Sequence, residues 1–295
     1  MSKLALGTVQ FGLDYGVSNQ DGKVILTEAK AILKACEEFG ILSLDTAGDY
    51  GDSEKVLGNI GISNFSVTTK LSNLDAVTDS EINQLVKDQV NHSFSNLKCK
   101  QLHAVLVHNS QYLLSPQGQI IWKSLKNLQT QLNISKIGVS IYDPIELDHL
   151  EDLGINPEIV QSPYNIFDQK IYQSGWLEKL VDRGVEVHAR SVFLQGLLLQ
   201  DETLRDRYFY RWSDQFKQFR HLLEKSDRTA LELSLQFALA NPFFTKIVVG
   251  VQNVEQLREI ACVSSPRDDI IEGCHLACDD LDLIRPQNWK LEHEN

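Results

Sequence analysis

Four residues between positions 45 and 108 have types that could together transfer a proton: Asp45, Tyr50, Lys70 and His108. An ordinary tyrosine, with a pKa near ~10, is a poor proton donor to a carbonyl at neutral pH. A nearby ammonium lowers that pKa, and a carboxylate beside the ammonium keeps the lysine charged and in place. Tyr50 would then be a general acid that Lys70 and Asp45 adjust. A neutral His108 would donate a hydrogen bond to a substrate oxygen.

Each of these side chains also has an ordinary structural explanation, such as a helix cap for Asp45 or a packed loop residue for Tyr50. Their placement favours a shared function. Three short apolar runs end at Asp45, Lys70 and His108, and Tyr50 follows the first of them. Parallel strands bring such residues to one rim, where barrel enzymes keep their catalytic groups.

The elements that would position these residues alternate along the whole chain. We expect strands at 3–6, 41–44, 66–69, 102–107, 136–139, 158–160, 185–189 and 246–249, and helices at 26–39, 53–57, 79–97, 119–132, 144–153, 173–183, 229–240 and from 254. Units of about 30 residues in this order predict a parallel sheet. Polar residues at the end of almost every strand favour a closed (β/α)8 TIM barrel over an open doubly wound sheet. Residues 1–295 are expected to form one domain, with a long loop at about 193–227 that either covers the site as a flap or packs as an Ω-loop.

The composition excludes several classes of partner. A formal net charge of -12 disfavours nucleic acid and anionic membrane surfaces. No run is long enough for a membrane span, and the N-terminus has no secretory pattern. The five cysteines lack the disulfide framework that is typical of secreted proteins. This indicates a reducing compartment, so we expect a cytoplasmic protein. Cys274, His275 and Cys278 superficially resemble metal ligands, but no second pair accompanies them, and we expect no metal.

Phosphate-binding motifs of the common kinds are absent from the sequence. Gly7-Thr8 follows the first strand, but neither a Gly-x-Gly-x-x-Gly turn nor a Gly-x-x-x-x-Gly-Lys-Ser/Thr loop occurs. Residues 249–253 lead into a helix whose N-terminus could bind a phosphate. Asn253 fits better as the N-cap of that helix.

Several motifs occur in an order that resembles the aldo-keto reductases along nearly the whole chain. They are Asp45-Thr46-Ala47-x-x-Tyr50-Gly51, Lys70 after Val67-Thr68-Thr69, His108 after Leu106-Val107, Gly138-Val139-Ser140, Gln161 with Tyr164-Asn165, Arg190-Ser191 with Gly196-Leu197-Leu198, and Ile247 to Val251 with Gln256 and Glu259. The resemblance implies a (β/α)8 barrel that binds NADP(H) in an extended form without a Rossmann domain. It also implies that Tyr50 protonates a carbonyl oxygen as hydride arrives.

The same resemblance implies roles for the remaining site residues. Ser140 and Gln161 would hold the nicotinamide carboxamide. The other expected cofactor contacts are Gly7, Thr8, Arg190, Ser191, Leu194, Gly196, Gly250, Gln252, Gln256 and Glu259. The expected walls of the substrate pocket are Gln10, Phe11 and Tyr15, with Trp289 as a further candidate. Polar Gln10 would suit a hydroxylated substrate such as a sugar.

Three departures from the family pattern bear on the cofactor. Arg190 replaces the aromatic residue that stacks on the nicotinamide, and its charge would change the redox balance of the cofactor. Ile141 stands where many members have asparagine. Positions 250, 252 and 256 carry no cation for a 2′-phosphate. The resemblance favours NADP(H), and NAD(H) is the alternative.

The sequence therefore predicts an NAD(P)(H)-dependent oxidoreductase that interconverts an aldehyde, ketone or sugar with an alcohol. It predicts no oligomeric state. One alternative is a Schiff-base aldolase with Lys70 as nucleophile. Another is a regulatory or sensor protein that binds the cofactor and catalyses little.

Overall fold

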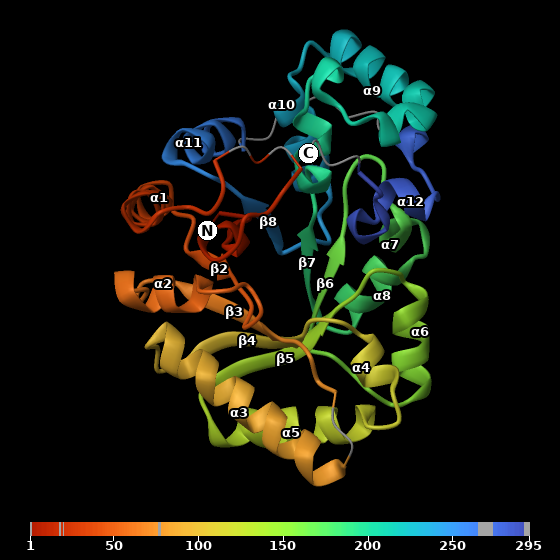
Figure 1. The fold of residues 1–295 in the computed structure, drawn as a ribbon. Helices are drawn as coiled ribbons and strands as arrows, with labels where there is room; N and C mark the ends of the chain where they lie inside the picture. The colour runs from red at the N-terminus through yellow and green to blue at the C-terminus, as the bar shows by residue number, and fades with distance from the viewer. Residues whose placement is uncertain (1, 18, 20, 76–77, 265–273, 292–295) are drawn as a thin grey trace.

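The computed structural model describes the chain except residues 1, 18, 20, 76–77, 265–273 and 292–295. Eight parallel strands form a closed barrel in the order of the sequence (Figure 1). They are β1 (Leu4–Gly7), β2 (Ser43–Asp45), β3 (Ser66–Leu71), β4 (Leu102–Val107), β5 (Ile134–Ser140), β6 (Ile159–Pro163), β7 (Glu186–Arg190) and β8 (Lys246–Gly250). Because β1 pairs with both β2 and β8, the sheet has no free edge. The predicted (β/α)8 barrel is confirmed.

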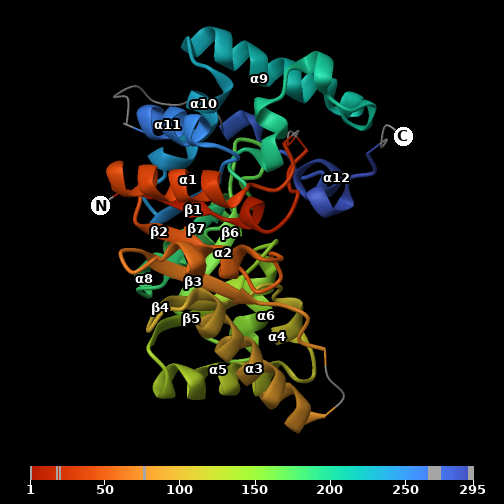
Figure 2. The ribbon, with the colours of Figure 1, turned by 60° about the vertical axis from the view of Figure 1, so that its left-hand side comes forward.

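Helices surround the barrel on its outer side (Figures 1 and 2). They are α1 (Leu26–Glu38), α2 (Ser53–Ile60), α3 (Asp79–Leu97), α4 (Gln111–Leu114), α5 (Gly118–Gln131), α6 (Ile145–Asp152), α7 (Lys170–Gln173), α8 (Trp176–Asp182), α9 (Ser213–Ser226), α10 (Ala230–Ala240), α11 (Val254–Val263) and α12 (Leu281–Ile284). In Figure 2, α9 and α10 lie at one end of the molecule and α3 and α5 at the other. None of the helices in these described ranges combines the length and apolarity that a membrane crossing requires.

Local sequence signals explain where several helices begin. Thr78 and Thr229 each form a capping box with the glutamate three residues later, at α3 and α10. The side chain of Asn253 accepts a hydrogen bond from the backbone N–H of Gln256, so its predicted role as the N-cap of α11 is confirmed.

Strand alternation separates two packing regions. Val105 and Val107 belong to the large core between barrel and helices. Ala104, Leu106 and Ile159 form a small separate cluster, as expected for side chains that fill the barrel interior. Strand register places Asp45 beside Thr68, and Gln161 beside His188. The polar residues of the site thus lie next to the apolar cluster that fills the barrel interior.

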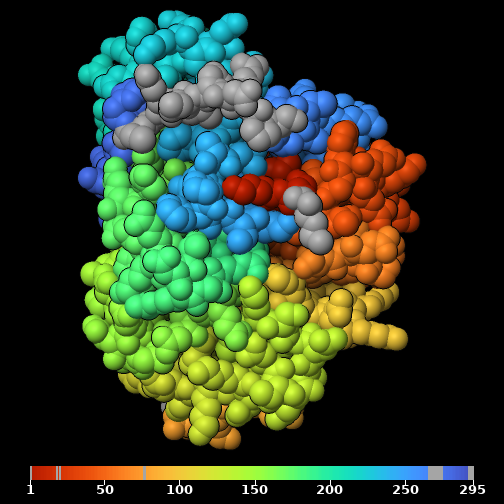
Figure 3. Space-filling view, turned by 180° about the vertical axis from the view of Figure 1, so that it is seen from behind, coloured from red at the N-terminus to blue at the C-terminus, as the bar shows by residue number. Residues whose placement is uncertain are grey.

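The face opposite to that of Figure 1 shows how the chain start is held. In Figure 3 the first residues, in red, lie among light blue residues of the β8 region. Lys246 donates from Nζ to the carbonyl oxygen of Ser2 at 2.7 Å, and β8 pairs with β1 beside it. The first and last strands are therefore joined by side-chain as well as backbone bonds.

Two segments differ from the sequence prediction. The segment 193–227, expected as a long loop, contains short 3-10 turns and the 14-residue helix α9. Phe216, Phe219 and Leu222 of α9 are buried along one stripe, and this spacing was not used in the prediction. The helix expected over 173–183 begins only at Trp176, as α8, and the separate α7 ends at Gln173, because Gly175 between them has φ of +77°.

The cysteines offer little new information on metal binding. Cys99 and Cys278 are partly buried thiols without a disulfide. The interpretation of Cys274 as an inert thiol is not tested, since its side chain lies outside the described residues.

Candidate active site

A buried ion pair forms the base of the site. Lys70 Nζ lies 2.5 Å from Asp45 Oδ1, and the two side chains are 0% and 6% exposed. The ammonium also donates to the carbonyl oxygen of Thr46 at 2.9 Å. Gln161 Nε2 donates to the second carboxylate oxygen of Asp45 at 2.7 Å. Every oxygen of the carboxylate is therefore bonded, which fixes both charges in place.

The ring of Tyr50 lies against this pair and against His108. Lys70 Nζ is 5.1 Å from the centroid of the Tyr50 ring. The rings of Tyr50 and His108 meet edge to face, with centroids 5.5 Å apart at 74°. The sequence-predicted catalytic set of Asp45, Tyr50, Lys70 and His108 is thus one contact group in the structure.

Two glycines set the position of the loop that carries Tyr50. A Cβ on Gly12 would lie 1.7 Å from the backbone oxygen of Tyr50. Gly51 has φ of +53°, and a Cβ there would lie 2.5 Å from the backbone oxygen of Gly12. Neither position accepts a side chain without backbone movement, so the loops after β1 and β2 touch directly.

Buried hydroxyl groups hold the same two loops together. Ser53 Oγ donates to the carbonyl oxygen of Thr8 at 2.8 Å and lies 3.1 Å from Thr46 Oγ1. Thr8 Oγ1 donates to the carbonyl oxygen of Asp45 at 3.0 Å. Thr8, expected as a cofactor contact, therefore uses its hydroxyl to join the ends of β1 and β2.

The pKa of Tyr50 is shifted in a direction that the sequence argument did not anticipate. Burial of the phenol raises this pKa well above its ordinary value, and the carboxylate of Asp45 raises it further. The guanidinium of Arg190 acts in the opposite direction. Because Asp45 lies 2.5 Å from the Lys70 ammonium, it opposes the field of that ammonium at the ring. Tyr50 therefore holds its proton at neutral pH.

His108 is oriented by two neighbours that the sequence analysis missed. Its Nδ1 lies 2.9 Å from Ser72 Oγ and 3.2 Å from a carboxylate oxygen of Asp49. Burial acts to raise the pKa of Asp49, but the hydrogen bond and charge of His108, together with Ser72 and Lys70, outweigh burial and lower it. A carboxylate at Nδ1 favours a proton on that nitrogen. Both neighbours lie in loops after strand ends, a signal that the sequence does contain.

These groups open onto a cleft of about 680 Å³ at the carboxyl ends of the strands. The predicted residues that line it are Asp45, Tyr50, His108, Gly7, Thr8, Gln161, Arg190, Ser191, Gly196, Gly250, Gln252, Gln256, Glu259, Gln10 and Tyr15. The cleft thus brings together most of the residues that the sequence singled out.

Five predicted residues do not line this cleft. Lys70 lies behind it, in contact with the Tyr50 ring. Ser140 is 1% exposed, and its Oγ accepts from Arg190 Nε at 3.3 Å. Leu194 is 0% exposed and belongs to the core.

The two aromatic residues among these five were expected in the substrate pocket, and neither expectation holds. The ring of Phe11 is 1% exposed, because the short 3-10 turn after β1 directs it into the core. Trp289 packs edge to face on Phe209, with ring centroids 4.9 Å apart.

Arg190 stacks on the aromatic ring of Tyr142, a contact that the sequence did not reveal. Its guanidinium lies 4.3 Å from the centroid of the Tyr142 ring. It donates to Ser191 Oγ at 3.2 Å and to the carbonyl oxygen of Ile141 at 3.0 Å. Within the described ranges, none of the ion pairs involves Arg190. Tyr142 also lines the cleft, two residues after Ser140.

The loop after β7 has the backbone of a ligand-binding segment. Ser191, Leu194 and Gln195 have φ of +59°, +48° and +55°, which is costly for residues other than glycine. Gly196 follows with φ of +91° and lines the cleft. Such strain persists where the surrounding structure maintains it, often at ligand sites.

Unpartnered polar atoms also lie along the cleft. Gln10 Oε1 and Gln252 Oε1 are buried, and neither has a hydrogen-bond partner among the described residues. A Cβ on Gly250 would lie 2.6 Å from Gln10 Nε2, so a larger residue at 250 would displace the end of the Gln10 side chain. The cleft therefore runs past strained backbone and free acceptors, features that fit an elongated polar cofactor.

Comparisons with known proteins place this geometry in a family. The sequence pattern of the Aldo/keto reductase family matches residues 3–267. The uncharacterised oxidoreductase YqkF of Bacillus subtilis (strain 168) is 25% identical over 281 residues, which cover 88% of this chain and 90% of that protein.

Solved structures share the fold. The holo form of an aldo-keto reductase from Bacillus halodurans gives a TM-score of 0.74 at 21% identity, over 93% of this chain and 90% of that chain. A glycerol dehydrogenase from Gluconobacter oxydans gives 0.69 at 20% identity, over 100% of this chain and 95% of that chain. With the family pattern matched over most of its length, the chain belongs to the aldo/keto reductases, a family of carbonyl–alcohol oxidoreductases.

Proposed function

We propose that this protein is an NAD(P)(H)-dependent oxidoreductase in which Tyr50 exchanges a proton with the oxygen of a small carbonyl or alcohol. The observation that carries the proposal is the position of the Tyr50 ring. It lies between the Lys70–Asp45 pair and His108, beside a cleft of about 680 Å³.

The proton chemistry follows from the charges around Tyr50. Burial and Asp45 raise the pKa of the phenol, so it enters reduction as a proton donor. The bound nicotinamide would supply the hydride. As the proton leaves, negative charge on the Tyr50 oxygen is stabilised by Lys70, 5.1 Å from the ring centroid, and by Arg190, which favours the phenolate. In oxidation the substrate hydroxyl would return the proton to the Tyr50 phenolate, which the same two cations stabilise.

His108 would orient the substrate oxygen. With Asp49 and Ser72 at Nδ1, the opposite nitrogen, Nε2, is free to face the cleft that His108 lines. We assign to this nitrogen the contact with the substrate oxygen that the sequence analysis expected of His108.

Cofactor binding would fall to the cleft residues near β6, β7 and β8. Gln161 is held by Asp45 and lines the cleft where a carboxamide would lie. The loop containing Ser191 and Gly196 offers strained backbone, and Gln10 and Gln252 offer unpartnered acceptors.

The choice between NADP(H) and NAD(H) depends on the α11 end of the cleft. The resemblance favours NADP(H). Against it, the charged residue that lines this end is the carboxylate of Glu259, which repels a 2′-phosphate. The amides of Gln252 and Val254 already donate to Gln256 and Glu28, at 2.8 Å each. Among the described residues these features favour NAD(H).

The walls near Tyr50 are polar, which suits a hydroxylated substrate. Tyr15, Asn19 and Tyr142 line the cleft with Gln10. Gln195 Nε2 donates to the Tyr15 hydroxyl at 2.8 Å and also lines the cleft. We propose a small polyhydroxylated carbonyl compound as substrate.

The test begins with fluorescence titration of the full chain with NADH and NADPH. Oxidation of the bound reduced cofactor is then followed with aldoses, other hydroxyaldehydes and flat apolar ketones. Turnover of the hydroxylated compounds supports the proposal, and turnover of only the apolar ketones contradicts the substrate class. Cofactor binding without turnover of any carbonyl would instead identify the sensor alternative.

The aldolase alternative has a structural argument against it. A Schiff-base lysine must reach its substrate. Lys70 is 0% exposed, donates to Asp45 and Thr46, and does not line the cleft. Borohydride trapping of an adduct on Lys70 would overturn this argument.

A further inference from the structure

A group of metal-ligating side chains lies away from the cleft, at the amino-terminal ends of β4 and β7. His103 is the second residue of β4, and Glu186 and His188 are the first and third residues of β7. One ligand atom from each lies within 4.8 Å of the other two. The three residues have no part in the proposed reductase chemistry.

The carboxylate of Glu186 is the centre of this group. Its Oε1 lies 3.0 Å from His103 Nε2 and 2.7 Å from His188 Nε2. The side chains of His103, Glu186 and His188 are 28%, 12% and 3% exposed. Two imidazoles thus converge on one carboxylate in a largely buried place, and His103 leaves a path for an ion from solvent.

We propose that His103, Glu186 and His188 bind a divalent transition-metal ion of the zinc class. Two imidazole nitrogens and one carboxylate oxygen are a ligand set that Zn²⁺ uses, with a fourth position left for water. Imidazole ligands disfavour Mg²⁺ and Ca²⁺, which take oxygen ligands.

The histidine tautomers permit this binding. Both Nε2 atoms face a carboxylate, so in the ion-free protein they carry protons. Binding requires each proton to move to Nδ1. His188 Nδ1 is buried without a hydrogen-bond partner among the residues described, so no bond is lost there when the tautomer changes.

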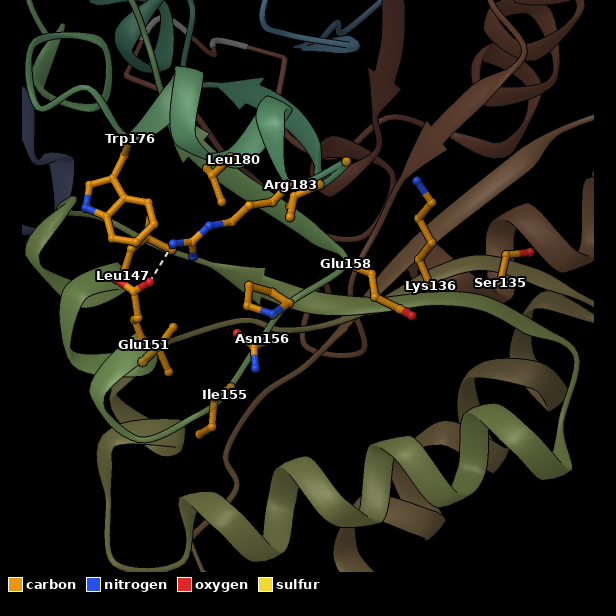
Figure 4. A pocket seen from close by; sticks show the side chains of 14 residues that line it. Ser135, Lys136, Leu147, Glu151, Ile155, Asn156, Glu158, Trp176, Leu180 and Arg183 are labelled. Atoms are coloured by element: carbon orange, nitrogen blue, oxygen red, sulfur yellow. Dashed lines mark hydrogen bonds and ion pairs between the residues drawn. The ribbon is translucent and has the colours of Figure 1, made fainter.

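Lys136 would compete with a metal ion for the carboxylate of Glu186. Its ammonium lies 2.6 Å from Glu186 Oε2 and so shares this carboxylate with the two imidazoles. Lys136 also lines a separate pocket of about 430 Å³ with Arg183, Glu158 and Trp176 (Figure 4). This pocket gives the lysine side chain room to move aside. Lys246, in register with His188, is engaged with Ser2 instead.

The experiment uses the chelator-treated full chain, titrated with ZnCl2 by calorimetry. The wild type should bind one ion, and His103→Gln should weaken binding tenfold or more, at least the loss that removing an outer-shell partner of a metal causes. His221→Gln, a change at an exposed histidine, should leave the affinity unchanged. Lys136→Gln should tighten binding about tenfold, because it removes a like charge next to the ion. Misfolding cannot produce that gain.

Co²⁺ in place of Zn²⁺ reports which atoms bind. A visible d–d spectrum without thiolate charge transfer supports ligation by nitrogen and oxygen. Three results would overturn the proposal: no binding by the wild type, equal affinity in His103→Gln and His221→Gln, or a thiolate band that places the ion on cysteine.

Discussion

The guanidinium of Arg190 lies 4.3 Å from the centroid of the Tyr142 ring, and both residues line the cleft that Tyr50 also lines. Arginine stacks on aromatic faces as a planar cation, so its charge stays fixed where it lies. Within the described part of the chain no carboxylate forms an ion pair with it. The site therefore contains a positive charge that Tyr142 orients but does not neutralise.

This charge leads to a prediction about cofactor affinity. An oxidised nicotinamide is positively charged and a reduced one is neutral, so Arg190 should favour the reduced form. Arg190→Met should lower the ratio of the Kd for oxidised to reduced cofactor by about tenfold. Fluorescence and calorimetric titrations measure both constants. Arg183→Met, in the pocket of Figure 4, is the control. An unchanged ratio would place Arg190 away from the nicotinamide.

Tyr50→Phe tests the proton donor. The variant should lose turnover by roughly 10²–10⁴-fold, because the ring remains and only the hydroxyl is removed. Cofactor affinity should change by less than about twofold, since the Lys70–Asp45 pair is independent of that hydroxyl. Steady-state kinetics and cofactor titration provide the two readouts, with Tyr172→Phe at an exposed position as control. Wild-type turnover in Tyr50→Phe would end the assignment.

Gln252→Arg tests the basis of cofactor preference. A cation at this position of the cleft should strengthen NADPH binding by about tenfold and leave NADH binding nearly unchanged, because only NADPH carries the 2′-phosphate. Parallel titrations with both cofactors check this expectation. Gln131→Arg, on the exposed end of α5, controls for the added charge. Equal gains for both cofactors would show that the 2′-phosphate does not lie near residue 252.

The buried carboxyl of Asp168 leads to the prediction that Asp168→Asn is more stable than the wild type above pH 6. Burial raises the pKa of this carboxyl from 3.8 to about 6, and its Oδ2 has no partner among the described residues. A raised pKa means that the folded state holds the proton more tightly, so the contribution of Asp168 is fully present below pH 4 and is lost as the pH rises through 6. Asp168→Asn should therefore match the wild type near pH 4 and exceed it above pH 6.

The size of this effect has an upper limit of about 3 kcal/mol in the free energy of unfolding. Denaturant unfolding at several pH values measures it. Asp152→Asn, at an exposed position of α6, is the matched control. A constant difference between wild type and Asp168→Asn across the pH range would mean that Asp168 does not titrate as described.

The barrel and the contact group of Asp45, Tyr50, Lys70 and His108 could be predicted, because both follow from patterns along the sequence. Alternating apolar runs and helix signals fix the order of elements, and parallel strands carry Asp45, Lys70 and His108 to a common rim. The role of Asn253 was predictable for the same reason, since a cap depends on residues three positions away.

The remaining details depend on three-dimensional packing that the sequence pattern does not specify. Phe11 and Tyr15 lie four positions apart, yet one ring enters the core and the other lines the cleft. The direction of the Tyr50 pKa shift required knowing that the phenol is buried and that Asp45 lies close enough to Lys70 to oppose its charge. The stacking of Arg190 on Tyr142 joins residues from β7 and the loop after β5, which no local signal connects.

The contact between Gly12 and Gly51 sets a limit on how this protein can be redesigned. Enlarging or reshaping the substrate pocket calls for variation in the residues around Tyr50, yet these two neighbours offer no freedom of choice. Mutant libraries should keep both glycines and vary Gln10, Tyr15 and Asn19, whose side chains already border the open space. The lining of the cleft can then change while Tyr50 stays where it is.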